Sequence, residues 1–136
     1  MAKTEKFKRI FTKFEKAFSK YEEIIKSEEL FEYLSEELII GISTKRFEYT
    51  FESLWHSLKA YLKAEGVEAT TPLRCFKEAF KLGLIKQEDE DIIVDMIEKR
   101  NQIVHIYDFD QAKEIYQFVK KPEVYRAIKS LYNKLK

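Results

Sequence analysis

The sequence predicts an all-α protein, an up-and-down helical bundle of about five to six helices that resembles a four-helix bundle. Three observations lead to this prediction. The 136 residues include only three glycines and two prolines, so few positions interrupt a helix. Apolar residues recur every three or four positions through most of the chain, as on one face of an amphipathic helix. Runs of alternating apolar and polar residues, which are typical of strands, are absent.

The composition is typical of a single globular domain over residues 1–136. Charged residues make up 36% of the chain and hydrophobic residues 45%, and a chain of this length can bury about two-thirds of its unfolded surface. The formal net charge is +1, so a nucleic-acid site would have to be a local patch.

We expect a cytoplasmic protein that does not enter a membrane. The longest run of apolar residues and glycine, Leu38 to Ile42, is too short to span a bilayer. No apolar run follows the charged N-terminus, as it would in a signal peptide. Cys75 is the only cysteine, so it forms no internal disulfide and fits a reducing compartment. We expect its side chain to be small, buried and inert.

Two long antiparallel helices are predicted first, because the connection between them is short. One extends from about Lys6 to Lys26 and the other from about Glu29 to Ala64, with Gly66 as the stop of the second. The apolar stripe of the first comprises Phe7, Ile10, Phe11, Phe14, Phe18, Tyr21, Ile24 and Ile25. The stripe of the second comprises Leu30, Leu34, Leu38, Ile42, Phe47, Phe51, Leu54, Trp55, Leu58, Tyr61 and Leu62.

Shorter helices are predicted to pack against these two. Thr71 has the side chain of an N-cap, Pro72 suits the first helical position, and Gly83 ends that helix. An acidic segment, Gln87 to Asp91, opens a fourth helix that we expect to extend to about Ile106.

The last two helices are predicted from their first residues. Asp110 is the expected N-cap of a short helix that ends at Val119. Pro122 is the expected start of the final helix. One face of that helix carries Val124, Tyr125, Ile128, Leu131, Tyr132 and Leu135.

The sequence predicts neither a metal site nor a cofactor. Asp89 and Asp91 form an Asp-x-Asp pair, but no third carboxylate stands at ligand spacing, so helix capping and solvation explain the pair better. His56 follows Trp55 with no other histidine or cysteine at ligand spacing, and we expect it at the core edge or the surface.

The stretch from Glu98 to Asp108 carries the candidate functional residues. Arg100 falls on a helical stripe that is otherwise apolar, formed by Ile93, Ile97, Val104 and Tyr107. A guanidinium keeps its proton and is costly to bury without a partner. Either this stripe meets a cleft or a partner, or Arg100 pairs with an acid such as Glu98, Glu48 or Glu52.

Arginine, asparagine, histidine and a phenol converge within two turns here, at Arg100, Asn101, His105 and Tyr107. Tyr107 shares the face of Arg100 if the helix continues that far. Arginine binds phosphate in a bidentate manner, and histidine exchanges a proton near neutral pH, so the pair suits metal-free cleavage of a phosphodiester. On a straight helix Arg100 and His105 are offset by about 140°, so two copies related by a two-fold axis would complete a cleft. The alternative is that His105 only caps the helix or fills a gap.

The segment from Arg100 to His105, R-N-Q-I-V-H, resembles the motif of the HEPN superfamily, in which arginine precedes histidine by four intervening residues. The extension to Tyr107 resembles the toxin branch that is paired with a minimal nucleotidyltransferase antitoxin. The blocks from Arg46 to Trp55 and from Arg74 to Ile85 are similar to signatures of the nucleotidyltransferase substrate-binding proteins. Together these segments extend the resemblance over nearly the whole chain.

The resemblance implies a helical bundle that dimerises through the helices carrying the motif. It implies a metal-independent endoribonuclease toxin that cleaves RNA, with Arg100 and His105 catalytic and Asn101 in support. A partner nucleotidyltransferase would silence it by adding AMP to Tyr107. Ile103 and Val104 replace the small polar residues that this family often carries, and dimer contacts would explain them.

The resemblance also supports an alternative function, a non-catalytic subunit that binds substrate for a separate nucleotidyltransferase. A third hypothesis is a degenerate helical interaction protein, which the intact Arg100, His105 and Tyr107 set disfavours.

Overall fold

Six α-helices make up most of what the computed structural model describes, residues 3–27, 29 and 32–136. The helices are α1 (Glu5–Lys26), α2 (Glu36–Ala64), α3 (Pro72–Lys81), α4 (Glu90–Ile103), α5 (Phe109–Val119) and α6 (Pro122–Leu135), with a 3-10 turn, η2 (Gln87–Asp89), leading into α4. The described residues contain no strand, so the predicted all-α bundle is confirmed.

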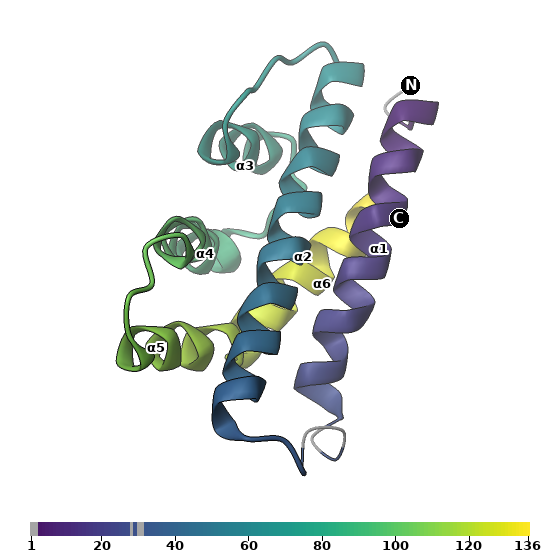
Figure 1. Cartoon of the computed structure of the whole chain (residues 1–136). Helices are drawn as coiled ribbons and strands as arrows, with labels where there is room; N and C mark the ends of the chain where they lie inside the picture. Colours follow the sequence, from purple (N-terminus) through teal and green to yellow (C-terminus); the bar gives the residue numbers. More distant parts are fainter. Residues whose placement is uncertain (1–2, 28, 30–31) are drawn as a thin grey trace.

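The two long helices, α1 and α2, lie side by side and run in opposite directions (Figure 1). The short helices α3, α4 and α5 lie one above another along one side of α2, with their axes across it. Helix α6 crosses behind the long pair and contacts α1, α4 and α5. Helix α4, which carries the candidate residues, is therefore placed by both α2 and α6.

The core consists largely of aromatic side chains from α1 and α2. Phe14, Phe47 and Phe51 are fully buried, and burying each such side chain stabilises the fold by about 1.5–3 kcal/mol. Buried Tyr21 donates a hydrogen bond from its hydroxyl to the backbone oxygen of Val119, at 2.8 Å, and so ties α1 to the end of α5. Burial raises the pKa of Tyr21, so this hydroxyl keeps its proton.

Several predicted helix ends are confirmed by local chemistry. The Thr71 hydroxyl accepts a hydrogen bond from the backbone N–H of Arg74, at 3.2 Å, and Pro72 is the first residue of α3. Gly66 and Gly83 follow α2 and α3 with φ of 86° and 78°, which a side chain would strain.

Cys75 is fully buried, and this burial raises the pKa of its thiol to about 11.

The predicted start of α2 is wrong, because the helix begins at Glu36 rather than near Glu29. The hydroxyl of Ser35 accepts a hydrogen bond from the backbone N–H of Leu38, at 3.2 Å, and this cap fixes the first turn. Leu38 and Leu34, which were expected in the apolar stripe, are exposed, whereas Leu30 lies outside the described residues. The first turns of α2 bury Ile40, Ser43 and Thr44 instead.

The predicted end of α4 is also wrong, because the helix stops at Ile103 instead of near Ile106. The backbone N–H of His105 bonds to the oxygen of Gln102, at 2.9 Å, and closes a final turn. The N-cap of α5 is Asp108 rather than Asp110, since the Asp108 carboxylate accepts from the backbone N–H of Gln111, at 2.8 Å. The backbone of Asp108 is extended, so α4 and α5 do not form one continuous helix.

None of the helices in the described part of the chain combines the length and the apolar character needed to cross a membrane.

Candidate functional site

Arg100 lies in the last turn of α4 and has an acidic partner on α2. Its Nε donates a hydrogen bond to Oε1 of Glu52, and its Nη1 donates to Oδ1 of Asn101 at 3.2 Å. The guanidinium carbon lies 5.8 Å from the centre of the Phe51 ring. Of the acids considered from the sequence, Glu52 is the partner, whereas Glu48 pairs with Lys45 at 3.0 Å.

Glu52 holds Arg100 in place and is itself held from its own helix. Its second carboxylate oxygen accepts a hydrogen bond from Nε1 of Trp55, at 3.0 Å. The side chains of Arg100 and Glu52 are 29% and 32% exposed, so the pair sits at the surface rather than in the core. Sequence reasoning named Glu52 but missed the role of Trp55. The available signal was the three-residue spacing of the two side chains, which are neighbours on a helix.

His105 and Tyr107 lie beyond α4, on the segment that connects it to α5. Both side chains are exposed, Tyr107 to 83%, and the neighbouring Val104 is 70% exposed. The backbone N–H of Tyr107 bonds to Oε1 of Gln111, at 3.0 Å. The expectation that Tyr107 shares a helical face with Arg100 is therefore wrong, since the helix does not reach it.

The structure brings Arg100 and Asn101 together by a hydrogen bond and places His105 and Tyr107 on the adjoining segment. None of the hydrogen bonds among the described residues joins the side chain of His105 or Tyr107 to Arg100. The bonds to Glu52 and Asn101 use two of the five N–H donors of the guanidinium, so donors remain for an anion. The carboxylate of Glu52 offsets part of the positive charge of Arg100.

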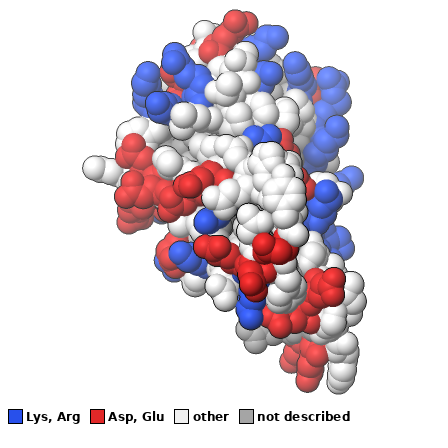
Figure 2. Space-filling model, turned by 60° about the vertical axis from the view of Figure 1, so that its left-hand side comes forward, with Lys and Arg blue, Asp and Glu red and all other residues white. Residues whose placement is uncertain are grey.

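Charge is unevenly distributed over the face that presents α3, α4 and α5 (Figure 2). Lysine and arginine side chains gather over its upper part and along one side, whereas acidic side chains gather over its middle and lower parts. This pattern matters because the overall net charge is only +1, so anion binding depends on where the positive charge is concentrated.

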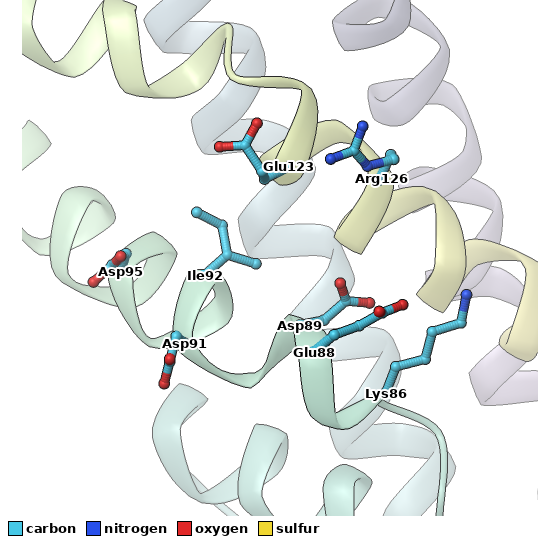
Figure 3. A pocket seen from close by; sticks show the side chains of 8 residues that line it. All are labelled: Lys86, Glu88, Asp89, Asp91, Ile92, Asp95, Glu123 and Arg126. Carbon is cyan, nitrogen blue, oxygen red and sulfur yellow. The ribbon is translucent and has the colours of Figure 1, made fainter.

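A cavity of about 390 Å³ is acidic and is lined by none of the predicted site residues. Figure 3 shows Glu123 and Arg126 of α6 across from Lys86, Glu88 and Asp89. Burial and the nearby Glu88 raise the pKa of Asp89, although Lys86 and Arg126 act in the opposite direction. Asp91, Asp95 and Ile92 complete the lining. Nowhere in residues 3–27, 29 and 32–136 do three acidic, histidine or cysteine side chains cluster as metal ligands would.

A second hollow, of about 200 Å³, is an apolar groove between α3 and α4. Its apolar lining includes Leu73, Phe80, Val94 and Ile97, and two of these side chains, Leu73 and Val94, are exposed. The outer face of α4 therefore presents apolar surface on the same helix that carries Arg100 in its last turn.

The helical bundle and the spacing of Arg100 and His105 agree with the HEPN-like class of protein that the sequence resembles. The chain belongs to the family described as nucleotidyltransferase substrate binding protein like, whose model matches residues 8–136. It is also similar to a solved crystal structure of a protein from Thermus thermophilus, with 28% sequence identity and a TM-score of 0.77. That likeness covers 90% of this chain and 98% of the other. No match is found among curated proteins.

Proposed function

We propose that this chain is a substrate-binding subunit that works with a separate nucleotidyltransferase. Membership of the substrate-binding family over residues 8–136 supports this function. The observation that carries the proposal is the exposure of Val104 and Tyr107 on the segment after α4. An apolar side chain and a phenol in such a position suit contact with a partner protein.

If the chain is instead a ribonuclease that its partner silences, the Tyr107 hydroxyl is the acceptor of AMP. The phenol oxygen would attack the α-phosphorus of ATP bound to the partner, the phenol proton would pass to a base of that enzyme, and pyrophosphate would leave. The 83% exposure of Tyr107 supports this assignment, because an enzyme can reach the side chain without unfolding the bundle. The added phosphate would bring negative charge to the segment that follows α4.

A second candidate function is a metal-independent endoribonuclease, with Arg100 and His105 catalytic and Asn101 in support. The partnered but partly exposed guanidinium of Arg100 favours it, because donors remain for a phosphate. One copy leaves His105 on a separate turn, so this function requires a homodimer that pairs two α4 helices. The apolar groove beside α4 supports such pairing.

The first experiment mixes the chain with a candidate partner nucleotidyltransferase, adds ATP, and measures intact mass and complex size. We expect a stable complex, whereas mass increments of AMP would favour the ribonuclease that its partner silences. Such increments should disappear in Tyr107→Phe and persist in Tyr33→Phe, which alters a tyrosine that is 92% exposed in the connection between α1 and α2. Absence of a complex would refute the proposal.

The second experiment separates the two functions with the chain alone. The ribonuclease function predicts RNA cleavage in the presence of a chelator and its loss in Arg100→Ala and His105→Ala. The binding-subunit function predicts no cleavage by the wild type. Cleavage that survives in both variants would exclude Arg100 and His105 as the catalytic pair.

A further inference from the structure

A hollow between the start of α1 and the end of α2 is lined by basic side chains and is unrelated to the site at Arg100. We call it the α1–α2 hollow; its volume is about 200 Å³. It is lined by Lys6, Ile10, His56, Lys59, Ala60 and Lys63. Two helices thus contribute three lysines and a histidine around a floor of two apolar side chains, and no carboxylate lines the hollow.

The three lysines of the α1–α2 hollow lack acidic partners within the described part of the chain. The ion pairs found there involve other cations, such as Lys8 with Glu5 and Lys45 with Glu48. Those lysines have an acid three positions away on the same helix, whereas Lys59 and Lys63 are each other's neighbours at helical spacing. Like charges held together in this way favour an anion between them.

His56 is oriented so that one ring nitrogen remains available. Its Nδ1 lies 2.7 Å from the backbone oxygen of Glu52. A carbonyl oxygen only accepts, so Nδ1 must donate; Nε2 carries a lone pair in the neutral ring and an N–H donor in the imidazolium. The imidazole also packs on the Trp55 ring, with ring centres 4.1 Å apart, which limits its rotation.

Lys59 and Lys63 also line an adjoining hollow of about 230 Å³, where Glu68 is the acidic residue. The two lysines therefore lie between the α1–α2 hollow, which no carboxylate lines, and the adjoining hollow, which Glu68 lines. An anion is favoured on the α1 side, where positive charge meets no carboxylate.

We propose that the α1–α2 hollow is a binding site for a phosphate group. Its volume falls below the roughly 300–1,000 Å³ of pockets that enclose whole ligands, so it suits phosphate rather than a buried base. Lysine ammonium groups bind phosphate as point charges, and the imidazolium form of His56 adds a directional N–H donor at Nε2. The phosphate comes from a nucleotide or from a nucleic-acid backbone. The proposal does not rest on the proposed function, because it concerns a different surface.

The test follows the two histidine side chains by NMR while inorganic tripolyphosphate is titrated into the chain alone. The chain has two histidines, so His105→Ala assigns the imidazole signals. We expect the His56 signals to shift, whether or not those of His105 respond to an anion at Arg100. Affinity should fall by about tenfold or more in Lys59→Ala/Lys63→Ala, because two charged contacts are lost.

The matched control is Lys16→Ala/Lys134→Ala, which removes the same charge from exposed lysines outside the hollow. It should change the affinity by less than about twofold, since distant surface charges are screened. Equal loss in both variants, or a His56 signal that does not move, would overturn the proposal. ATP and a single-stranded RNA oligonucleotide are then tested as competitors. Displacement by ATP alone identifies a nucleotide, displacement by RNA identifies a backbone, and displacement by neither overturns the site.

Discussion

Arg100 shows how a charged side chain on an apolar stripe is accommodated. Its partner, Glu52, stands 48 positions earlier in the chain and on another helix. Trp55 holds the second oxygen of that carboxylate, so the pair has a defined geometry although both side chains are partly exposed. Arg100 is therefore an oriented guanidinium that retains free donors, which suits either candidate function.

A double-mutant cycle measures this pair. Glu52→Gln and Arg100→Met should show a coupling free energy of about 1 kcal/mol in urea unfolding, because the charged hydrogen bond is only partly shielded from water. The control cycle uses Glu5 and Lys8, an exposed pair three positions apart on α1. Its coupling should be about 0.3–0.5 kcal/mol. A coupling at Glu52 no larger than in the control would contradict the assigned role.

Among the helices, the junction between α4 and α5 decides where the candidate residues lie. Ile103 and Ile106 pack against the core on either side of the turn, and Asp108 begins the next helix. Val104, His105 and Tyr107 are consequently left exposed on a short connector. A helix that continued to Ile106, as the periodicity alone suggested, would place Val104 and His105 within α4 instead of on a connector.

The corrected cap can be tested directly. Asp108→Ala should lower the free energy of unfolding by about 1 kcal/mol, because the first turn of α5 loses the acceptor for the N–H of Gln111. Asp110→Ala removes a carboxylate from the same turn that is not the cap, and its effect should be about 0.5 kcal/mol or less. Thermal or urea unfolding compares the two variants. A larger effect at Asp110 would restore the cap predicted from the sequence.

At the scale of the whole molecule, polar contacts link α1 to α6 across an aromatic layer. Glu22 accepts a hydrogen bond from the Tyr125 hydroxyl and lies within ion-pair distance of Lys26 and Lys129. The hydrogen bond from Tyr125 is the main cause that lowers the pKa of Glu22, with the two lysines contributing and burial opposing. The ring of Tyr125 stacks on Phe18, with centres 5.8 Å apart.

This contact predicts a pH-dependent contribution to stability. The pKa of Glu22 is lower in the folded state than its ordinary value of 4.5, so the ionised carboxylate stabilises the fold above that pH. The contribution disappears as pH falls below 4.5 and through the folded-state pKa. Glu22→Gln should therefore destabilise the protein by about 1 kcal/mol near neutral pH and by progressively less in acid.

Urea unfolding at several pH values measures this difference. Glu114→Gln, at an exposed position on α5, is the control and should show little change at any pH. A Glu22→Gln effect that stayed constant down to acidic pH would contradict the assignment.

The features that the sequence predicts correctly depend on interactions between residues close together in the chain. The all-α class, the cap at Thr71, the stops at Gly66 and Gly83 and the start at Pro122 all follow from the sequence. They depend on periodicity and on side chains that bond to nearby backbone, and these act over a few residues. The sequence also singled out Arg100 correctly as a residue that needs a partner.

The tertiary structure decided the partner of Arg100, the end of α4 and the separation of Tyr107 from the face of Arg100. It also brought Lys6 of α1 beside the lysines of α2, although more than fifty positions separate them in the chain. Such pairings depend on which helix faces pack together, because a side chain meets a distant residue only after both helices have buried their apolar stripes. Local sequence therefore determines the helices of this protein, and their packing determines its charged sites.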